Sequence, residues 1–420
     1  MRRHLTWRSL ATALCALCGA CAPIEGPVTV EALVSDPDAE GGARLDDVVL
    51  TTVTDLRAGQ GADFDVVGGL RMVSDRVIEA AAAADSDQDM RERARGDDIG
   101  HAIAARMSFD GTRWQAEDFQ TLTMFSAFAG LENAWRYAEE VGDDSGATGD
   151  AALVGLEATA VASEGLPISI MTSDNAAYAA PLDGWLLLRV ALQDGVPFAM
   201  SEHILAHEYG HRFFHKNVYD TDAAFAFYKK RFGEGTEAEA RAIRLTQGVD
   251  EGLADLFSLG ATGDKGGIPR TFEAAGSVFA AEAARRDLEG AFADAATYAG
   301  LREQTVDTEL SGGCGAQQTG DLFAQASFNF YCLGTVLARS LWDASDRDVE
   351  VLRGEVQPAV RRALSRMGEA MGESGDFDLD VLLEPIAAEL PPGARRDAAC
   401  AAFRDKFGEL VDQERVPTCL

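Results

Sequence analysis

Basic residues are scarce in this chain of 420 residues. It has 37 lysines and arginines against 69 aspartates and glutamates, which gives a formal net charge of −32 at pH 7. A surface this acidic repels nucleic acid and anionic lipid, so we expect neither as a partner. Long apolar runs are lacking beyond residue 20, which argues against a membrane-spanning helix. The hydrophobic fraction of 47% is ample for a packed core, so the acidity does not indicate disorder.

Cysteine is also sparse, and three of the seven cysteines lie in an N-terminal segment typical of an export signal. Residues 1–10 are basic, and residues 10–20 form an apolar run too short to span a bilayer stably. Leu17-Cys-Gly-Ala-Cys21 is similar to a bacterial lipoprotein cleavage site, which implies a signal peptide over 1–20 and a lipid on Cys21. Ala22 in place of Asp favours the outer membrane by the same resemblance. The alternative is ordinary signal-peptidase cleavage, which would give a periplasmic or secreted soluble protein.

The other four cysteines are an even number in a chain that we expect to be exported, which predicts two disulfides. Three pairings are possible. We favour the pairs closest in sequence, Cys314–Cys332 and Cys400–Cys419, of which the second would fasten the C-terminus.

Histidine is rare, with six residues in the chain, and four of them recur at intervals of four between His203 and His215. The apolar residues of this segment have helical spacing, and Ser201 is a suitable N-cap. Only His207 and His211 form the pattern His-Glu-x-x-His. Residues four apart share a helix face, so both imidazoles can bind one metal ion, with Glu208 beside it as a base for water. His203 and His215 are expected to be flanking or surface residues.

A catalytic zinc site normally has three protein ligands, and no histidine follows His215. The third ligand is therefore a carboxylate or a cysteine, and Glu251 is the strongest candidate. Glu251 shares a helix face with Asp255, which we expect to accept the outer N–H of a ligand histidine. If Glu251 is not the ligand, Asp250 and Asp255 are next in line. The alternative reading of this segment is an amphipathic helix with an acidic edge.

His207-Glu-Tyr-Gly-His211 followed by Glu251-Gly-Leu-Ala-Asp255 resembles the gluzincin metallopeptidases, particularly the thermolysin-like and fungalysin-like groups. This resemblance implies Zn²⁺ as the cofactor and a peptide or protein as the substrate. Upstream, Asn175-Ala-Ala-Tyr178 resembles the edge strand that holds the substrate in those enzymes, which makes Asn175 and Ala176 substrate-binding residues. Downstream, the helix from Tyr331 to Trp342 resembles their His-x-x-Gly helix. Tyr331 stands where they carry the histidine that stabilises the transition state.

The architecture implied by the resemblance is an α+β fold with two lobes of the zincin type. Residues 21–45, rich in proline and glycine, read as a lipid-anchored tether. Residues 46–217 are expected to form a mixed α+β lobe that ends in the helix of the two histidines, and residues 218–420 a mainly helical lobe. We expect strands near 47–54, 168–172 and 178–190, the last of them at the substrate-side edge. A long buried helix is expected over 118–141.

Together these features predict a monomeric zinc-dependent peptidase at the cell surface or in the periplasm, with Glu208 as the base and Tyr331 as the oxyanion donor. No Gly-x-Met-x-Asn-like segment precedes the helix, which favours an endopeptidase over an aminopeptidase. The alternative is a non-catalytic surface lipoprotein with the zincin fold. The intact Glu208 argues against it, because a structural metal site has no use for a base beside its ligands. Whether residues 46–117 form a propeptide stays open.

Overall fold

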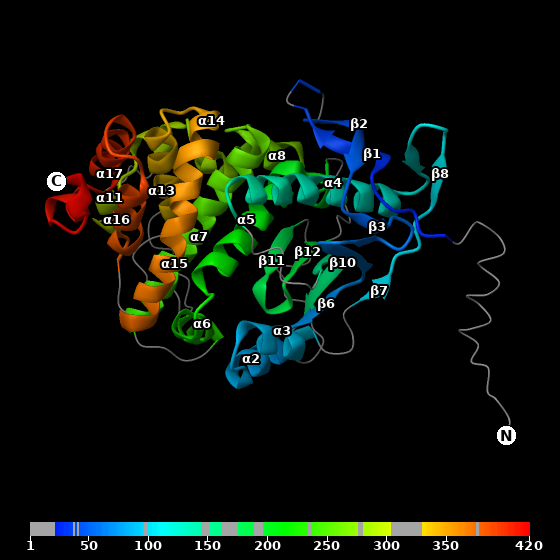
Figure 1. Cartoon of the computed structure of the whole chain (residues 1–420), viewed down its shortest axis with the longest axis horizontal. Helices are drawn as coiled ribbons and strands as arrows, with labels where there is room; N and C mark the ends of the chain where they lie inside the picture. Colours follow the sequence, from blue (N-terminus) through cyan, green and yellow to red (C-terminus); the bar gives the residue numbers. More distant parts are fainter. Residues whose placement is uncertain are drawn as a thin grey trace.

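The computed structural model describes residues 22–36, 38–39, 42–95, 100–143, 151–161, 175–188, 196–232, 237–275, 280–303, 330–374 and 378–420. They form a mixed α+β fold, as expected. All described strands precede residue 189, and every described element after residue 218 is helical. Helices α13, α15, α16 and α17 gather at one end of the molecule, and the larger sheet lies towards the other end (Figure 1).

The strands are β1 (Val28–Ser35), β2 (Ala43–Leu50), β3 (Val53–Asp55), β4 (Gln60–Gly61), β5 (Phe64–Gly68), β6 (Arg71–Val73), β7 (His101–Ala102), β8 (Met107–Phe109), β9 (Trp114–Ala116), β10 (Ala152–Val161), β11 (Ala176–Ala179) and β12 (Gly184–Leu188). The first helices are α2 (Ser74–Ala83), α3 (Asp87–Arg95), α4 (Phe119–Glu140) and the short helices η3 (Ala180–Leu182) and η4 (Phe198–Met200).

The helices that follow are α5 (Glu202–Val218), α6 (Asp222–Lys229), η5 (Lys230–Phe232), α7 (Glu237–Thr262), α8 (Gly267–Ala274), α9 (Ala280–Ala283), η6 (Ala284–Arg286), α10 (Ala291–Ala295), α11 (Tyr298–Glu303), α13 (Phe330–Ala344), α14 (Val349–Val351), η7 (Leu352–Val356), α15 (Gln357–Ser374), α16 (Asp380–Glu389), α17 (Ala394–Asp412) and η8 (Pro417–Cys419).

Two sheets form the β part of the fold. The smaller one has the order β2-β1-β9-β8, and the larger one runs β11-β12-β10-β5-β4-β3. The central pairs β12/β10 and β10/β5 are parallel, whereas β11 pairs antiparallel with β12 and ends the sheet. Strand β11 therefore has one edge without a strand neighbour in the described part of the chain.

Three of the expected elements differ from the structure. The tether expected over 21–45 joins the fold from residue 28, because β1 alternates apolar and polar residues and buries Val30 and Ala32 completely. The single strand expected over 178–190 is instead the hairpin of β11 and β12, with η3 between them, and its edge strand is β11. The strand expected at 47–54 breaks between β2 and β3, and the one at 168–172 lies outside the described residues.

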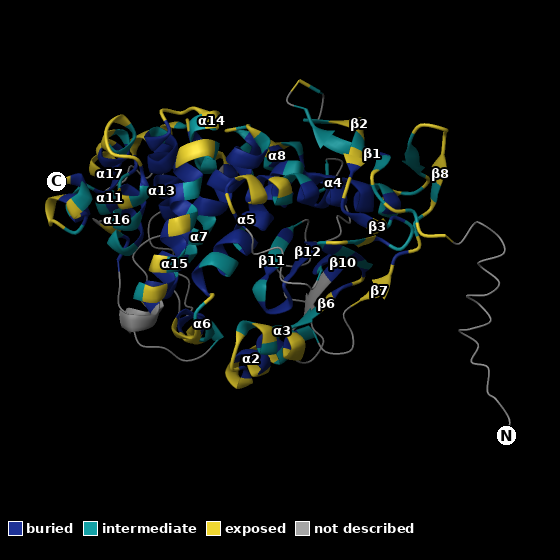
Figure 2. Cartoon of the chain, in the orientation of Figure 1, coloured by how far each residue is buried: buried dark blue, intermediate teal, exposed yellow. Residues whose placement is uncertain are grey.

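The long helix expected over 118–141 is confirmed as α4, and Asp118 caps it by accepting a hydrogen bond from the Thr121 N–H at 2.8 Å. The neighbouring helix α5 begins after Ser201, as expected. Helix α5 packs between α4 and α7, and α7 packs in turn against α13. Figure 2 shows these central helices mostly buried, with exposed residues gathered on outer elements such as α2 and α3.

Small residues allow the central helices to approach closely. A Cβ added to Gly210 of α5 would lie 2.7 Å from the Cα of Ala254 in α7, and one added to Gly252 of α7 would clash with the backbone of Gly334 in α13. No side chain fits at either contact. Direct contact between the backbones therefore determines the distance between these helices.

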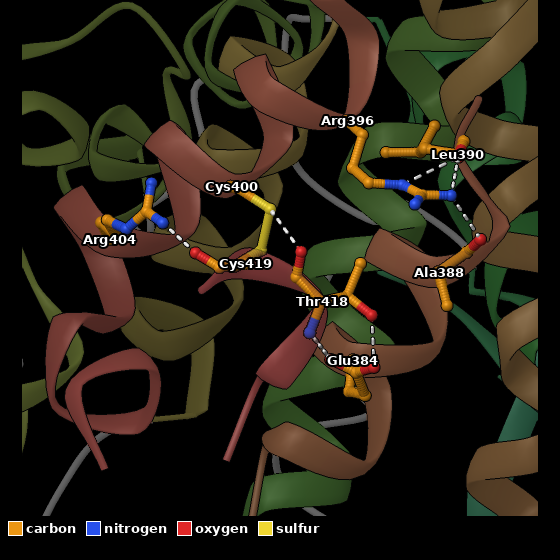
Figure 3. The surroundings of a disulfide bond; sticks show 8 residues. All are labelled: Glu384, Ala388, Leu390, Arg396, Cys400, Arg404, Thr418 and Cys419. Carbon is orange, nitrogen blue, oxygen red and sulfur yellow. Dashed lines mark hydrogen bonds between the residues drawn. A yellow bond between two sulfur atoms is a disulfide. The ribbon is translucent and has the colours of Figure 1, made fainter. Parts of the chain in front are cut away.

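A disulfide joins Cys400 of α17 to Cys419, which confirms one of the two expected pairs. Next to it, Glu384 of α16 accepts hydrogen bonds from the N–H and hydroxyl of Thr418 (Figure 3). The C-terminus is therefore held to both α16 and α17. The other expected pair involves Cys314, which lies outside the described residues.

Candidate metal centre

The imidazoles of His207 and His211 converge on one face of α5, as their spacing predicts. Their Nε2 atoms are 3.1 Å apart, and both rings are largely buried. Ligand atoms of His207, Glu208 and His211 all lie within 4.8 Å of one another. Two imidazole nitrogens this close, on one face of a helix, are suited to a single metal ion.

Glu251 reaches the same point from α7. Its Oε2 lies 3.4 Å from Nε2 of His207 and 3.9 Å from Nε2 of His211. Zinc bonds of about 2.0–2.1 Å in a tetrahedron place neighbouring ligand atoms roughly 3.3 Å apart. The three donor atoms therefore have a spacing that one metal ion can bridge.

Carboxylates hold the outer nitrogens of both imidazoles. Nδ1 of His207 lies 3.0 Å from Asp255, as expected, and Nδ1 of His211 lies 2.7 Å from Asp250. The sequence suggests Asp250 only as a substitute ligand, so its contact with the outer nitrogen of His211 is a finding of the structure. Each carboxylate fixes the ring orientation and the tautomer that leaves Nε2 free.

These acids also favour protonated imidazoles when no metal is bound. Burial lowers the pKa of His211, but Asp250 and Glu251 outweigh it and raise this pKa to about 10. For His207, burial and the Arg286 charge lower the pKa, while hydrogen bonds with Asp255 and Glu251 raise it above its usual value. The acidic shell therefore prepares the site for positive charge.

Glu208 lies beside the donor cluster and is fixed by the edge strand. Its Oε2 accepts a hydrogen bond from the backbone N–H of Tyr178 in β11 at 2.7 Å. Burial raises the pKa of Glu208, although His211 and His207 oppose the shift. A carboxylate with a raised pKa is a better proton acceptor, which is the property required of a general base.

The free edge of β11 runs past this cluster. The Ala176 N–H donates a hydrogen bond to the Asn175 side-chain oxygen at 3.0 Å. Asn175, Ala176 and Tyr178 all line the cavity at the site. An extended peptide can add to such an edge by main-chain hydrogen bonding.

A buried charge network ties this edge to α5. Asp183, in the turn between η3 and β12, accepts hydrogen bonds from the Tyr178 hydroxyl at 2.9 Å and from Arg212 Nε at 3.0 Å. Its other oxygen lies 3.1 Å from Arg91 and 3.2 Å from Lys216. Because Arg212 and Lys216 belong to α5, Asp183 fixes the edge strand relative to the histidines.

Tyr331 lies in the same cavity, at the start of α13, and Arg286 of η6 lies over its ring at 5.3 Å. Arg286 was not found from the sequence, where no motif marks it. It donates from Nε to Asp255 at 3.0 Å, and its Nη2 contacts the other oxygen of the same carboxylate. Nη2 is also 3.2 Å from both ring nitrogens of His207 and 3.5 Å from Glu251, so one guanidinium offsets part of the acidic charge.

The other two histidines of the helix do not join the cluster, but they are not surface residues. His203 is 6% exposed and lies between the Ser35 hydroxyl and Asp264. His215 is 4% exposed and contacts Asp87 at 3.1 Å. Both are buried because α5 is covered along most of its length.

A cavity of about 540 Å³ opens onto the donor cluster. Its walls include β11, α5, the chain after α5, and α7, together with Arg286 and Tyr331. A volume of this size accommodates a few residues of an extended peptide.

The chain matches no protein-family model and no curated protein. In the described part of the chain, none of the helices combines the length and the hydrophobicity that a membrane crossing requires. Cys21, the expected lipidation site, lies outside the described residues. The assignment of function therefore depends on the chemistry of the site.

Proposed function

We propose that this protein is a zinc-dependent peptidase of the gluzincin type, with the two-lobed zincin arrangement. One observation carries the proposal: Nε2 of His207, Nε2 of His211 and Oε2 of Glu251 lie 3.1–3.9 Å apart, with the Glu208 carboxylate beside them. Three donors of this kind, next to a carboxylate that can act as a base, suit hydrolysis better than a structural metal site.

His207, His211 and Glu251 would hold the metal, and Asp255 and Asp250 would orient the imidazoles. Zinc supplies a Lewis acid, which lowers the pKa of water and polarises a carbonyl group. Two neutral imidazoles and one carboxylate are a donor set that favours zinc over magnesium or calcium, which prefer oxygen ligands.

Glu208 would act as the base. Its Oε2 is occupied by the Tyr178 N–H, which leaves Oε1 to take a proton from the attacking water. As the C–N bond of the substrate breaks, the same carboxylate returns that proton to the leaving amine. Tyr331 is the proposed donor to the oxygen of the scissile carbonyl, because it lies on the wall of the same cavity.

The substrate would lie along β11. The main chain at Ala176 would pair with the peptide, and the Asn175 side chain, which now caps the Ala176 N–H, would be released to bind it. The sequence before α5 lacks a Gly-x-Met-x-Asn-like segment, which favours an endopeptidase over an aminopeptidase.

The test uses two single variants and a matched control. Glu251→Ala should lose most of its zinc, measured by elemental analysis, because one of three ligands is gone. Glu208→Gln should retain zinc while peptide hydrolysis falls by several orders of magnitude. Glu273→Gln removes an exposed carboxylate of α8 and should change neither quantity.

Full zinc occupancy in Glu251→Ala would move the third ligand elsewhere. Hydrolysis at the wild-type rate in Glu208→Gln would refute the assigned base. A wild-type protein that binds zinc tightly and hydrolyses no peptide would support the alternative, a non-catalytic zincin-fold protein.

A further inference from the structure

One wall of the cavity carries polar side chains that the described residues pair only in part. This wall consists of Tyr219, which follows α5, Arg231 of η5 and Gln247 of α7. None of the three belongs to the metal cluster or to the edge strand. Their position in the same cavity makes them accessible to a bound substrate.

Arg231 has no carboxylate within 4.0 Å among the described residues, in contrast to Arg286, which forms a two-point contact with Asp255. Arg231 is half-buried, and a guanidinium keeps its charge at every accessible pH, so even partial burial without an anion is costly. Its guanidinium lies over the ring of Tyr228 at 5.5 Å, and this contact offsets only part of that cost.

The Tyr219 hydroxyl is a second unsatisfied donor in this wall. Tyr219 is 4% exposed, and no acceptor for its O–H lies within hydrogen-bond distance in the described part of the chain. Arg231 acts on this hydroxyl through its charge and as a hydrogen-bond donor, so the two groups are close together and the O–H proton still needs an acceptor. Buried polar atoms are almost always satisfied, so a hydroxyl without an acceptor beside a cation without a carboxylate indicates an acceptor that comes with the ligand.

The nearby acids do not supply the carboxylate that Arg231 lacks. The charges of Asp250 and Glu251 act on Arg231, but Asp250 is bonded to His211, and Glu251 faces both imidazoles. Two donors, one of them a permanent cation, are the usual partners of a carboxylate.

We propose that Arg231 and Tyr219 form a subsite for a carboxylate of the substrate. This inference rests on the proposed peptidase function and specifies its substrate class as peptides with a carboxylate near the scissile bond. The aromatic rings of Tyr228 and Phe232 also line the cavity and would pack against the methylene groups that carry this carboxylate. The carboxylate is either the side chain of an Asp or Glu residue or the free C-terminus of a peptide.

Matched peptides test the subsite. One pair differs only by Glu or Gln within three residues of the cleaved bond, and a second pair only by a free or amidated C-terminus. The wild-type protein should cleave the acidic member of one pair with a kcat/KM roughly 10- to 100-fold higher, the range expected for a hydrogen bond to a charged group. The pair that shows the preference identifies the source of the carboxylate.

Arg231→Met should abolish that ratio, and Tyr219→Phe, which removes a single oxygen atom, should reduce it. Lys230→Met is the matched control, because it removes a positive charge from the exposed neighbouring residue and should leave the ratio unchanged. An equal kcat/KM for both members of both pairs, or a ratio that persists in Arg231→Met and Tyr219→Phe, would overturn the proposal.

Measurements of peptide binding distinguish a failure of the carboxylate subsite from a failure of the peptidase assignment. In the Glu208→Gln background, the Kd of both peptide pairs is measured. In one pair, the member with the carboxylate should bind roughly 10- to 100-fold more tightly than its neutral partner, and Arg231→Met should remove this difference. If no peptide is hydrolysed but this difference in Kd is present, the peptidase assignment fails and the carboxylate subsite stands. If hydrolysis occurs without any difference, the subsite fails and the peptidase assignment stands.

Discussion

Asp183→Asn should destabilise the protein and weaken hydrolysis at the same time. Asp183 is 4% exposed, and its neighbours are the cationic groups of Arg212, Arg91 and Lys216. Removing one member of a buried ion pair typically costs about 3–5 kcal/mol, because the remaining charge is left uncompensated. Asparagine fits the positive φ of 42° at this position and keeps its hydrogen-bonding capacity, so we expect about 3 kcal/mol.

The pH dependence of the unfolding free energy shows whether the loss of stability in Asp183→Asn is electrostatic. Burial alone would raise the pKa of Asp183, but Arg212, Lys216 and Arg91 hold it far below the ordinary value of 3.8. A depressed pKa stabilises the fold above the pKa of the unfolded chain, and this stabilisation is lost as the pH falls below that value. The difference between wild type and variant should therefore be constant from pH 7 to about pH 5 and smaller by about 1 kcal/mol at pH 3.

Urea unfolding at several pH values measures this difference. Asp89→Asn is the control, because it breaks an exposed pair with Arg93 and should leave the unfolding midpoint nearly unchanged. Hydrolysis should also fall in Asp183→Asn, since the strand that positions Glu208 through Tyr178 loses its tie to α5. A variant as stable as wild type at pH 7, or a difference as large at pH 3 as at pH 7, would refute the electrostatic argument.

Two further predictions concern the oxyanion donor and export. Tyr331→Phe should lower kcat by about 10²–10³ with zinc content and Tm nearly unchanged, because one hydrogen bond to the developing oxyanion is lost. A wild-type kcat would instead point to Arg286, which lies over the same ring. Another tyrosine of the helical part, Tyr298, cannot replace Tyr331, because its hydroxyl donates to Asp378 at 2.6 Å. Cys21→Ser should release the protein from the membrane into the soluble fraction; a wild-type protein that is already soluble would favour ordinary signal-peptidase cleavage.

Local periodicity explains the parts of the site that the sequence predicts. His207 and His211 are one helical turn apart, and so are Glu251 and Asp255, so each pair shares a face whatever the rest of the fold does. Only the packing of α5 against α7, which brings the two pairs together, depends on the tertiary structure. The alternation of apolar and polar residues in β1 is also visible in the sequence. The prolines and glycines that flank it are typical of a tether, and they obscure the strand.

Other residues could not be found in this way. Arg286, Arg231 and Tyr219 lie in short helices or at helix ends, and they reach the site only because distant segments pack together. No spacing in the sequence relates them to the histidines. The hairpin of β11 and β12 did carry a local signal, since Pro181-Leu-Asp-Gly184 is a turn-forming combination inside an apolar stretch.

The close contacts at Gly210 and Gly252 make the site vulnerable at positions that touch no substrate. Glu251 precedes Gly252 in sequence, so a methyl group at Gly252 that pushes α7 away from α13 also moves the carboxylate relative to Nε2 of both histidines. Metal coordination tolerates changes of only about 0.2 Å in bond length. Natural variation at these glycines should therefore be as restricted as at the ligands, and a protein with its complete ligand set can still lose its metal.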